Sequence, residues 1–263
     1  MTNVLTNDQL RAFAPSIFAS EPWHKMSGKY AFIPTIEVVE KLRHEGFVPV
    51  KAVQSRTRVP GKAEFTRHQI RFRQLDMAQA VARVGGIVPE VVVTNSHDGA
   101  SAYEVAGGLY RYVCANGLMV DDGIVAAIKV PHRGTADGII EASFEVIDQM
   151  PRALESVESF RNLRLAPPER AAFATAALAL RYDDAAPITP EAVVRPRRTE
   201  DAEPTLWNTF NVAQENLTQG GTRYRNQTSG RRARVRPVEG ISENTRLNKA
   251  LWTLAEEMKK LKS

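Results

Sequence analysis

The sequence predicts an α+β fold: a small antiparallel sheet with helices packed on it, followed by a helical C-terminal region. The apolar residues alternate along Phe47–Arg58 and Phe65–Leu75, as in half-buried strands, and Val91–Val93 is typical of a buried strand. Toward the C-terminus, apolar residues instead recur at helical spacing. A dinucleotide-binding fold would need regular strand–helix alternation and a glycine fingerprint, and the sequence has neither.

The N-terminal elements follow from local signals. A short amphipathic helix is expected over Thr6–Ile17, and a second helix begins at Pro34-Thr35 and ends at Gly46. Strands are expected over Phe47–Arg58, Phe65–Leu75, Glu90–Asn95 and Ile124–Val130, with helical pieces over Met77–Val84 and Ala100–Cys114.

The C-terminal elements are mostly helical. Helices are expected over Ile139–Leu163, with a possible kink at Pro151, and over 167–182, 206–217 and 244–261. The polar segment Gln219–Pro237 is expected to lack a core of its own. These elements predict a core domain over 1–183, a proline-rich linker over 184–204 and a C-terminal helical region with an arginine-rich loop over 205–263.

The first basic segment covers a predicted strand, its turn and the next strand. Arg71 and Arg73 share one face of their strand, so a basic two-stranded ribbon could follow a phosphate backbone. The alternative is a solvated sheet face with charged edges. The candidate nucleic-acid-binding residues here are Lys51, Arg56, Arg58, Lys62, Arg67, Arg71 and Arg73.

The second basic segment has six arginines and no acidic residue. Guanidinium groups suit phosphate recognition, and Tyr224 adds a possible stacking surface. The alternative is a flexible solvated loop, or one that pairs with Glu200, Asp201 and Glu203. The candidate residues here are Arg223, Tyr224, Arg225, Arg231, Arg232, Arg234 and Arg236.

Catalysis has weaker support. His97 and Asp98 lie between a strand and the next element, where they could bind a metal or act as an acid–base pair, but Asp98 or Ser96 could equally cap a helix. Cys114 follows a predicted helix rather than starting one, which favours a core position over a nucleophile. No catalytic residue, metal site or cofactor is therefore predicted, and an enzyme is the less favoured class.

The compartment expected from the sequence is the cytoplasm. The single cysteine, Cys114, allows no intramolecular disulfide, which is typical of proteins in reducing compartments. The first residues do not have the pattern of a signal peptide, and no apolar run reaches the length of a membrane span.

Several motifs resemble one known family. Thr94–Ser101, Gly108–Gly117, Leu206–Leu217, Gly220-Gly221 and Arg246–Trp252 are similar to the phage/plasmid-like proteins grouped as domain of unknown function 932. The resemblance covers most of the chain and implies an origin in plasmids, prophages or integrative elements. It implies no activity and supplies no catalytic residues.

Together these features favour a DNA-binding protein of a mobile genetic element. The more specific expectation is single-strand binding and annealing, or recombination mediation, through the basic groove of a homo-oligomer. The oligomer could form through the stripe Leu247, Leu251, Leu254 and Met258, unless that stripe packs on the chain's own core. The alternatives are a metal-dependent DNA nuclease that uses His97 and Asp98, and an anti-defence protein that binds a host protein.

Overall fold

The computed structural model of the 263-residue chain describes residues 4–26, 30–75, 87–111, 117–120, 127–131, 135–182, 186–225 and 230–262. The chain divides into two compact units, which we call the N-terminal unit, Met1–Met150, and the C-terminal unit, Pro151–Ser263. The α+β fold class is confirmed. The division falls earlier than the sequence suggested, since all residues from Pro151 onward belong to the C-terminal unit, including the predicted linker 184–204 with its short helical turns at Pro190–Val193 and Thr199–Asp201.

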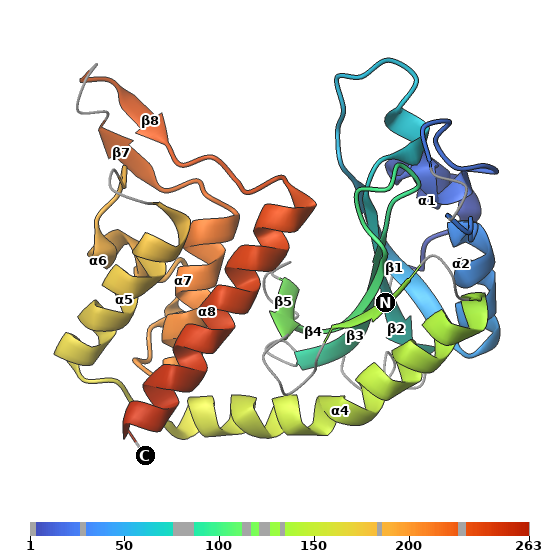
Figure 1. Ribbon diagram of the computed structural model, residues 1–263. Helices are drawn as coiled ribbons and strands as arrows, with labels where there is room; N and C mark the ends of the chain where they lie inside the picture. Colours follow the sequence, from blue (N-terminus) through green and yellow to red (C-terminus); the bar gives the residue numbers. More distant parts are fainter. Residues whose placement is uncertain are drawn as a thin grey trace. The chain divides into compact units, whose positions relative to one another are not determined.

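The N-terminal unit is built on an antiparallel sheet (Figure 1). Its strands are β1 (Phe47–Gln54), β2 (His68–Gln74), β3 (Ile87–Asn95), β4 (Tyr103–Arg111), β5 (Gly117–Val120) and β6 (Ile128–Val130). Neighbouring strands follow the order β1-β2-β3-β4-β5, and β6 pairs with β4. The strands expected over 47–58, 65–75 and 90–95 are therefore confirmed as β1, β2 and β3.

Helices cover one face of this sheet. They are α1 (Asn7–Phe13), α2 (Thr35–His44) and the first half of α4 (Ala136–Asn162), with short 3-10 turns at Pro15–Phe18 and Ala63–Phe65. Val38, Val39 and Leu42 of α2 are fully buried, as are Ile70 and Phe72 on the inner face of β2. The alternation predicted for β2 thus separates an apolar inner face from a face that carries Arg71 and Arg73.

The prediction of a helix over 100–114 was wrong. Residues Tyr103–Arg111 form β4, which pairs with β3 along eight successive residues. Tyr103, Val105 and Leu109 alternate as core residues of a strand, while Tyr103, Ala106 and Tyr110 also have helical spacing. The glycines Gly107 and Gly108 are poor helix formers, and pairing with the buried strand β3 decided the outcome.

The C-terminal unit is a helical bundle with a small hairpin. It contains the second half of α4, α5 (Pro167–Arg181), α6 (Pro190–Val193), a 3-10 turn at Thr199–Asp201, α7 (Leu206–Thr218), β7 (Arg223–Arg225), β8 (Arg232–Arg234) and α8 (Ile241–Lys262). Phe160, Phe210 and Trp252 meet in its core, with ring centroids 5.2–5.8 Å apart in the contacting pairs. Helix α7 is buried along almost its whole length.

The apolar stripe of α8 packs mainly on its own unit. Leu247 and Leu251 are fully buried within the chain, whereas Leu254 and Met258 are half-buried. The predicted short helix at 77–84 and Cys114 lie outside the described residues. Among the residues that the structure describes, none of the helices combines the length and the apolar run needed to cross a bilayer.

Candidate nucleic-acid interface

The arginine-rich segment forms an antiparallel hairpin rather than the loop expected from its composition. β7 and β8 pair in the register Arg223 with Arg234, Tyr224 with Ala233, and Arg225 with Arg232. Cross-strand partners lie on the same face of a hairpin, and neighbours along a strand lie on opposite faces. The register therefore places four arginines on one face, which we call the arginine face: Arg223, Arg225, Arg232 and Arg234.

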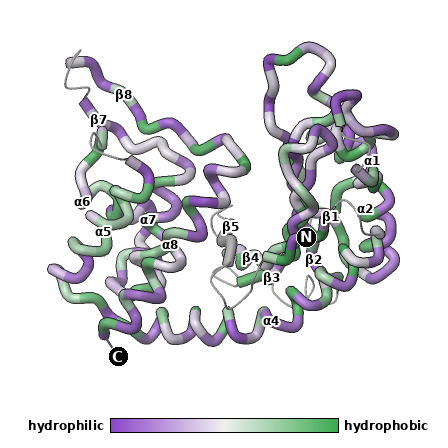
Figure 2. The backbone as a smooth tube through the Cα atoms, viewed as in Figure 1, coloured by the Kyte–Doolittle hydropathy of each residue, from purple (hydrophilic) through white to green (hydrophobic). Residues whose placement is uncertain are grey.

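The arginine face is open to solvent and strongly cationic. Its four side chains are exposed, and so are Arg231 and Arg236 beside it. Within the described part of the chain, no carboxylate forms an ion pair with any of these six residues. The expected pairing with Glu200, Asp201 and Glu203 is not seen there, since Asp201 pairs with Arg198 and Glu203 with Arg164. Residues of both strands line a hollow of about 790 Å³, and Figure 2 shows β8 as largely hydrophilic.

The base of the hairpin is fixed by two glycines. Gly220 and Gly221 have φ values of +65° and +82°, which other residues rarely adopt. A Cβ atom on Gly220 would lie 2.5 Å from the carbonyl oxygen of Val235, so no larger side chain fits there. The backbone closes between Gly221 N–H and Val235 O at 2.8 Å, and between Val235 N–H and Thr222 O at 2.9 Å.

Two further arginines of the same unit brace the base of the hairpin. Arg181, at the end of α5, donates to the carbonyl oxygen of Leu217 before the hairpin and to that of Arg236 after it, the latter at 2.5 Å. Arg197 donates through Nε to Asn216 Oδ1 at 2.8 Å and through Nη2 to the carbonyl oxygen of Gly220. We call Arg181 and Arg197 the hairpin braces. Neither was predicted, because nothing in their local sequence separates them from surface arginines.

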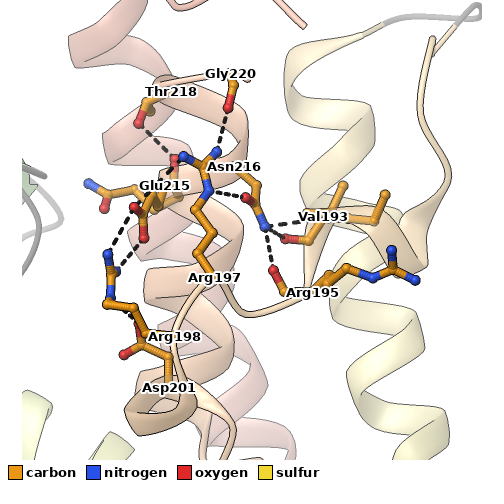
Figure 3. Close-up of polar contacts among 11 residues, drawn as sticks. Val193, Arg195, Arg197, Arg198, Asp201, Glu215, Asn216, Thr218 and Gly220 are labelled. Carbon is orange, nitrogen blue, oxygen red and sulfur yellow. Dashed lines mark hydrogen bonds and ion pairs between the residues drawn. The ribbon is translucent and has the colours of Figure 1, made fainter. Parts of the chain in front are cut away.

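The polar residues of α7 hold the segment that carries Arg197 (Figure 3). Asn216 Nδ2 donates to the carbonyl oxygens of Val193 at 2.8 Å and Arg195 at 3.0 Å. Arg198 pairs with Glu215 at 2.5 Å and with Asp201 at 3.0 Å. The motif 206–217, which carried part of the family resemblance, therefore has a structural role in the described chain: it positions the brace Arg197 against the base of the hairpin.

The structure places Arg71 and Arg73 differently from the arginine face. Both lie against the fully buried Glu90 of β3, with Nε–Oε distances of 2.5 and 2.6 Å, and their side chains are only 12% and 14% exposed. Arg71 also stacks on Tyr110, with its guanidinium carbon 3.1 Å from the ring centroid. Much of the positive charge of this pair is thus neutralised within the sheet.

The other predicted residues of the first basic segment fall into two groups. Lys51, Arg56 and Arg58 are exposed, on β1 or in the loop that follows it. Lys62 forms an ion pair with Asp98 at 3.0 Å, and Arg67 donates to the carbonyl oxygen of Ala100 at 3.0 Å. Part of the charge of this segment therefore holds the loop between β3 and β4.

His97 and Asp98 do not point into a shared site. The side chain of Asp98 caps the backbone N–H of Ala100 at 3.0 Å, within a loop rather than at a helix start, and binds Lys62. His97 is buried, with Nε2 3.1 Å from Thr35 Oγ1. In the part of the chain that the structure describes, no three His, Cys, Asp or Glu side chains come together in a way that could hold a metal.

Thr35 is the centre of a buried hydrogen-bond network at this end of the sheet. Its hydroxyl lies 2.9 Å from His68 Nε2 and from Tyr103 OH, and 3.0 Å from Asn95 Nδ2. His68 Nδ1 lies 2.8 Å from Ser16 Oγ, so both ring nitrogens of this histidine have partners. Burial lowers the pKa of His68 to about 4, and the imidazole is neutral at pH 7.

Comparison with known proteins defines the family. The model described as Domain of unknown function (DUF932) matches residues 22–252. The chain belongs to this family, as its motifs suggested. It is similar to two proteins of Escherichia coli strain K12, UPF0380 protein YafZ and UPF0380 protein YfjQ; each is 38% identical over 256 residues, which cover 97% of this chain and 91% of the relative. No solved structure matches.

Proposed function

We propose that this protein binds DNA through its phosphate backbone, and that the arginine face of the β7–β8 hairpin is the principal contact. The observation that carries the proposal is the register of the hairpin, which gathers four exposed arginines on one face. The four like charges repel one another in the free protein, and a bound polyanion relieves this repulsion.

The spacing of the arginine face suits consecutive phosphates. Arginines two residues apart on one strand are about 7 Å apart, and cross-strand partners about 5 Å apart. Phosphates along one nucleic-acid strand are separated by similar distances, and each guanidinium offers a planar fork of donors to a phosphate. The braces at Arg181 and Arg197 support the proposal, since a hairpin held at its base loses less conformational entropy on binding than a loose loop.

Little base preference is expected from this surface. The alternation of the strand turns Tyr224 away from the arginine face, and it pairs across the hairpin with Ala233. Without an aromatic side chain among the four arginines, the face offers charge but no stacking platform. Within this proposal, single-strand annealing or recombination mediation is the more specific role, and the exposed Lys51, Arg56 and Arg58 form a secondary contact.

The test is a salt titration of DNA affinity on single- and double-stranded oligonucleotides. Each lost phosphate contact should lower the slope of log K against log salt by about 0.9 on duplex and about 0.7 on single strands. Exchanging the cross-strand pair, Arg223→Gln with Arg234→Gln, should therefore reduce the slope by about two contacts. A fluorescence assay with complementary oligonucleotides then tests annealing.

The matched control removes the same charge elsewhere. Lys25 and Arg152 are exposed cations outside both basic segments, and Lys25→Gln with Arg152→Gln should leave the slope close to that of the wild type. A hairpin variant that keeps the wild-type slope would show that the arginine face does not touch phosphate. An acidic protein partner would then be the better explanation for it.

A further inference from the structure

The C-terminal unit carries an open groove, mostly apolar, along one face of α5. The groove encloses about 600 Å³, and α5 contributes Pro167, Arg170, Ala171 and Ala174 to it. The spacing of these residues places them on one face over two helical turns, a length of about 10 Å. Apart from Arg170, the residues on this face of α5 have small side chains, and Val194 also lines the groove. The groove is distinct from the hairpin, and its role is independent of the proposed DNA binding.

The walls of the groove favour an extended peptide. Four prolines line the groove: Pro167, Pro190, Pro196 and Pro204. These positions have no backbone N–H to donate. A length of about 10 Å accommodates about three residues of extended chain, at roughly 3.3 Å per residue. Proline-rich walls lose little conformational freedom on binding, so the groove is close to preorganised.

The charge in the groove is positive and incompletely satisfied. Arg170 donates through Nη2 to the carbonyl oxygen of Val194 at 2.7 Å. Its Nε is buried and has no hydrogen-bond partner among the described residues, where no carboxylate pairs with this guanidinium either. Burial lowers the pKa of Arg170, which reflects the cost of a charge without a counterion. Arg195 adds a second, exposed cation, and the lining carboxylate, Glu191, is itself hydrogen-bonded to Thr189.

We propose that this groove docks an extended segment of a partner protein, in which an acidic side chain pairs with the guanidinium of Arg170 and a neighbouring apolar side chain packs over the exposed Pro167 and Ala171. The carboxylate supplies a counterion for the half-buried guanidinium of Arg170, and the exposed Arg195 adds to the positive potential that attracts it. The apolar side chain removes the exposed carbon surface of the groove from water. Complementarity of both charge and polarity thus selects an acidic–apolar sequence over a basic or wholly polar one.

The test is selection of binding peptides from a random octapeptide phage library on the full-length protein. We expect the selected sequences to share Asp or Glu within two residues of Leu, Ile, Met or Phe. Ala171 and Ala172 are neighbouring exposed residues of α5, and only Ala171 lines the groove. Ala171→Glu should weaken binding of the best synthetic peptide at least tenfold, whereas Ala172→Glu should change it less than twofold.

Arg170→Gln gives an independent measure, because it keeps an amide donor but removes the charge. The affinity of this variant for the acidic peptide should fall. It should approach the affinity that the wild-type protein has for the same peptide with Asn in place of Asp. Selected peptides without an acidic–apolar pattern, or equal binding to the two alanine variants, would overturn the proposal. So would a groove that selects no peptide but binds decanoate in a manner that Ala171→Glu abolishes, since its ligand would then be a small carboxylic acid.

Discussion

At the scale of single residues, the ion pairs of Glu90 show that part of the first basic segment is structural. The alternation of β2 is visible in the sequence, and the structure confirms that Arg71 and Arg73 share a face. The sequence does not reveal that Glu90 lies beside them, because that depends on the register between β2 and β3. Arg71 and Arg73, which the sequence suggested as ligand-binding residues, instead pair with a buried carboxylate and so have a structural role in the sheet.

Removing both arginines should destabilise the protein. Arg71→Gln with Arg73→Gln leaves the Glu90 carboxylate buried and uncompensated, so the free energy of unfolding should fall by about 3–5 kcal/mol. Urea unfolding followed by circular dichroism measures the change. Adding Glu90→Gln to the double variant should recover much of the loss. A double variant as stable as the wild type would show that the pairs do not compensate the buried charge.

His68 should make the fold sensitive to acid. Its pKa is lowered to about 4 in the folded state, whereas an unfolded histidine titrates near 6.5, so protons bind the unfolded chain more tightly. The stability contributed by the neutral imidazole is complete above pH 6.5 and is lost as the pH falls toward 4. Across that window the loss from this residue should total about 3 kcal/mol.

The measurement is the slope of unfolding free energy against pH between 6.5 and 4, by urea titration at each pH. His68→Asn should flatten this slope, even though it also lowers stability at neutral pH. The exposed His44 provides the control, since His44→Gln should leave the slope unchanged. Equal slopes for His68→Asn and the wild type would mean that His68 is not held neutral by the fold.

At the scale of elements, the sequence predicted long periodic segments well and short, paired ones poorly. The long helices α4, α5, α7 and α8 all lie where their periodicity placed them. Strand β4 was mistaken for a helix because its apolar residues fit both periods, and the β7–β8 hairpin was mistaken for a loop because it has no apolar alternation. The arginines of the candidate site were therefore predicted, but their common face required the hairpin register.

Of two hairpin glycines with positive φ, Gly220 and Gly230, replacement of Gly220 should destabilise the protein more. Gly220→Ala adds a Cβ atom 2.5 Å from the carbonyl oxygen of Val235, in addition to a backbone cost of about 1–2 kcal/mol. Gly230 has a similar φ of +67° but nothing within 4 Å of a Cβ, so Gly230→Ala should show the backbone cost alone. Urea unfolding should rank Gly220→Ala as clearly less stable, and DNA affinity should follow the same order. Equal stabilities would contradict the close approach.

At the scale of the whole molecule, α4 belongs to both units. The chain divides between Met150 and Pro151, and the helix runs through this point from Ala136 to Asn162. A proline inside a helix removes one backbone hydrogen bond and crowds the preceding turn. The division therefore coincides with a point at which α4 lacks a backbone hydrogen bond. The sequence predicted the helix and a possible kink at Pro151, but not that the chain divides into its two units there.

Replacing this proline should strengthen the helix. Pro151 is exposed, so Pro151→Ala restores a backbone donor without disturbing a core, and the free energy of unfolding should rise by up to about 3 kcal/mol. Hydrogen exchange at residues 147–152 should slow in parallel. Arg152→Ala, at the next exposed position, should have little effect on either measurement. Unchanged stability and exchange in Pro151→Ala would show that the proline costs the helix nothing.

The braces at the base of the hairpin also determine its mechanical behaviour. Arg181 holds the chain both before β7 and after β8, and Arg197 holds it at Gly220. A force on either strand of the hairpin is therefore shared between both strands. It reaches the ends of α5 and α7 through several hydrogen bonds in parallel. If the arginine face binds a nucleic-acid strand as we propose, tension along that strand would pass through these hydrogen bonds into the helical bundle.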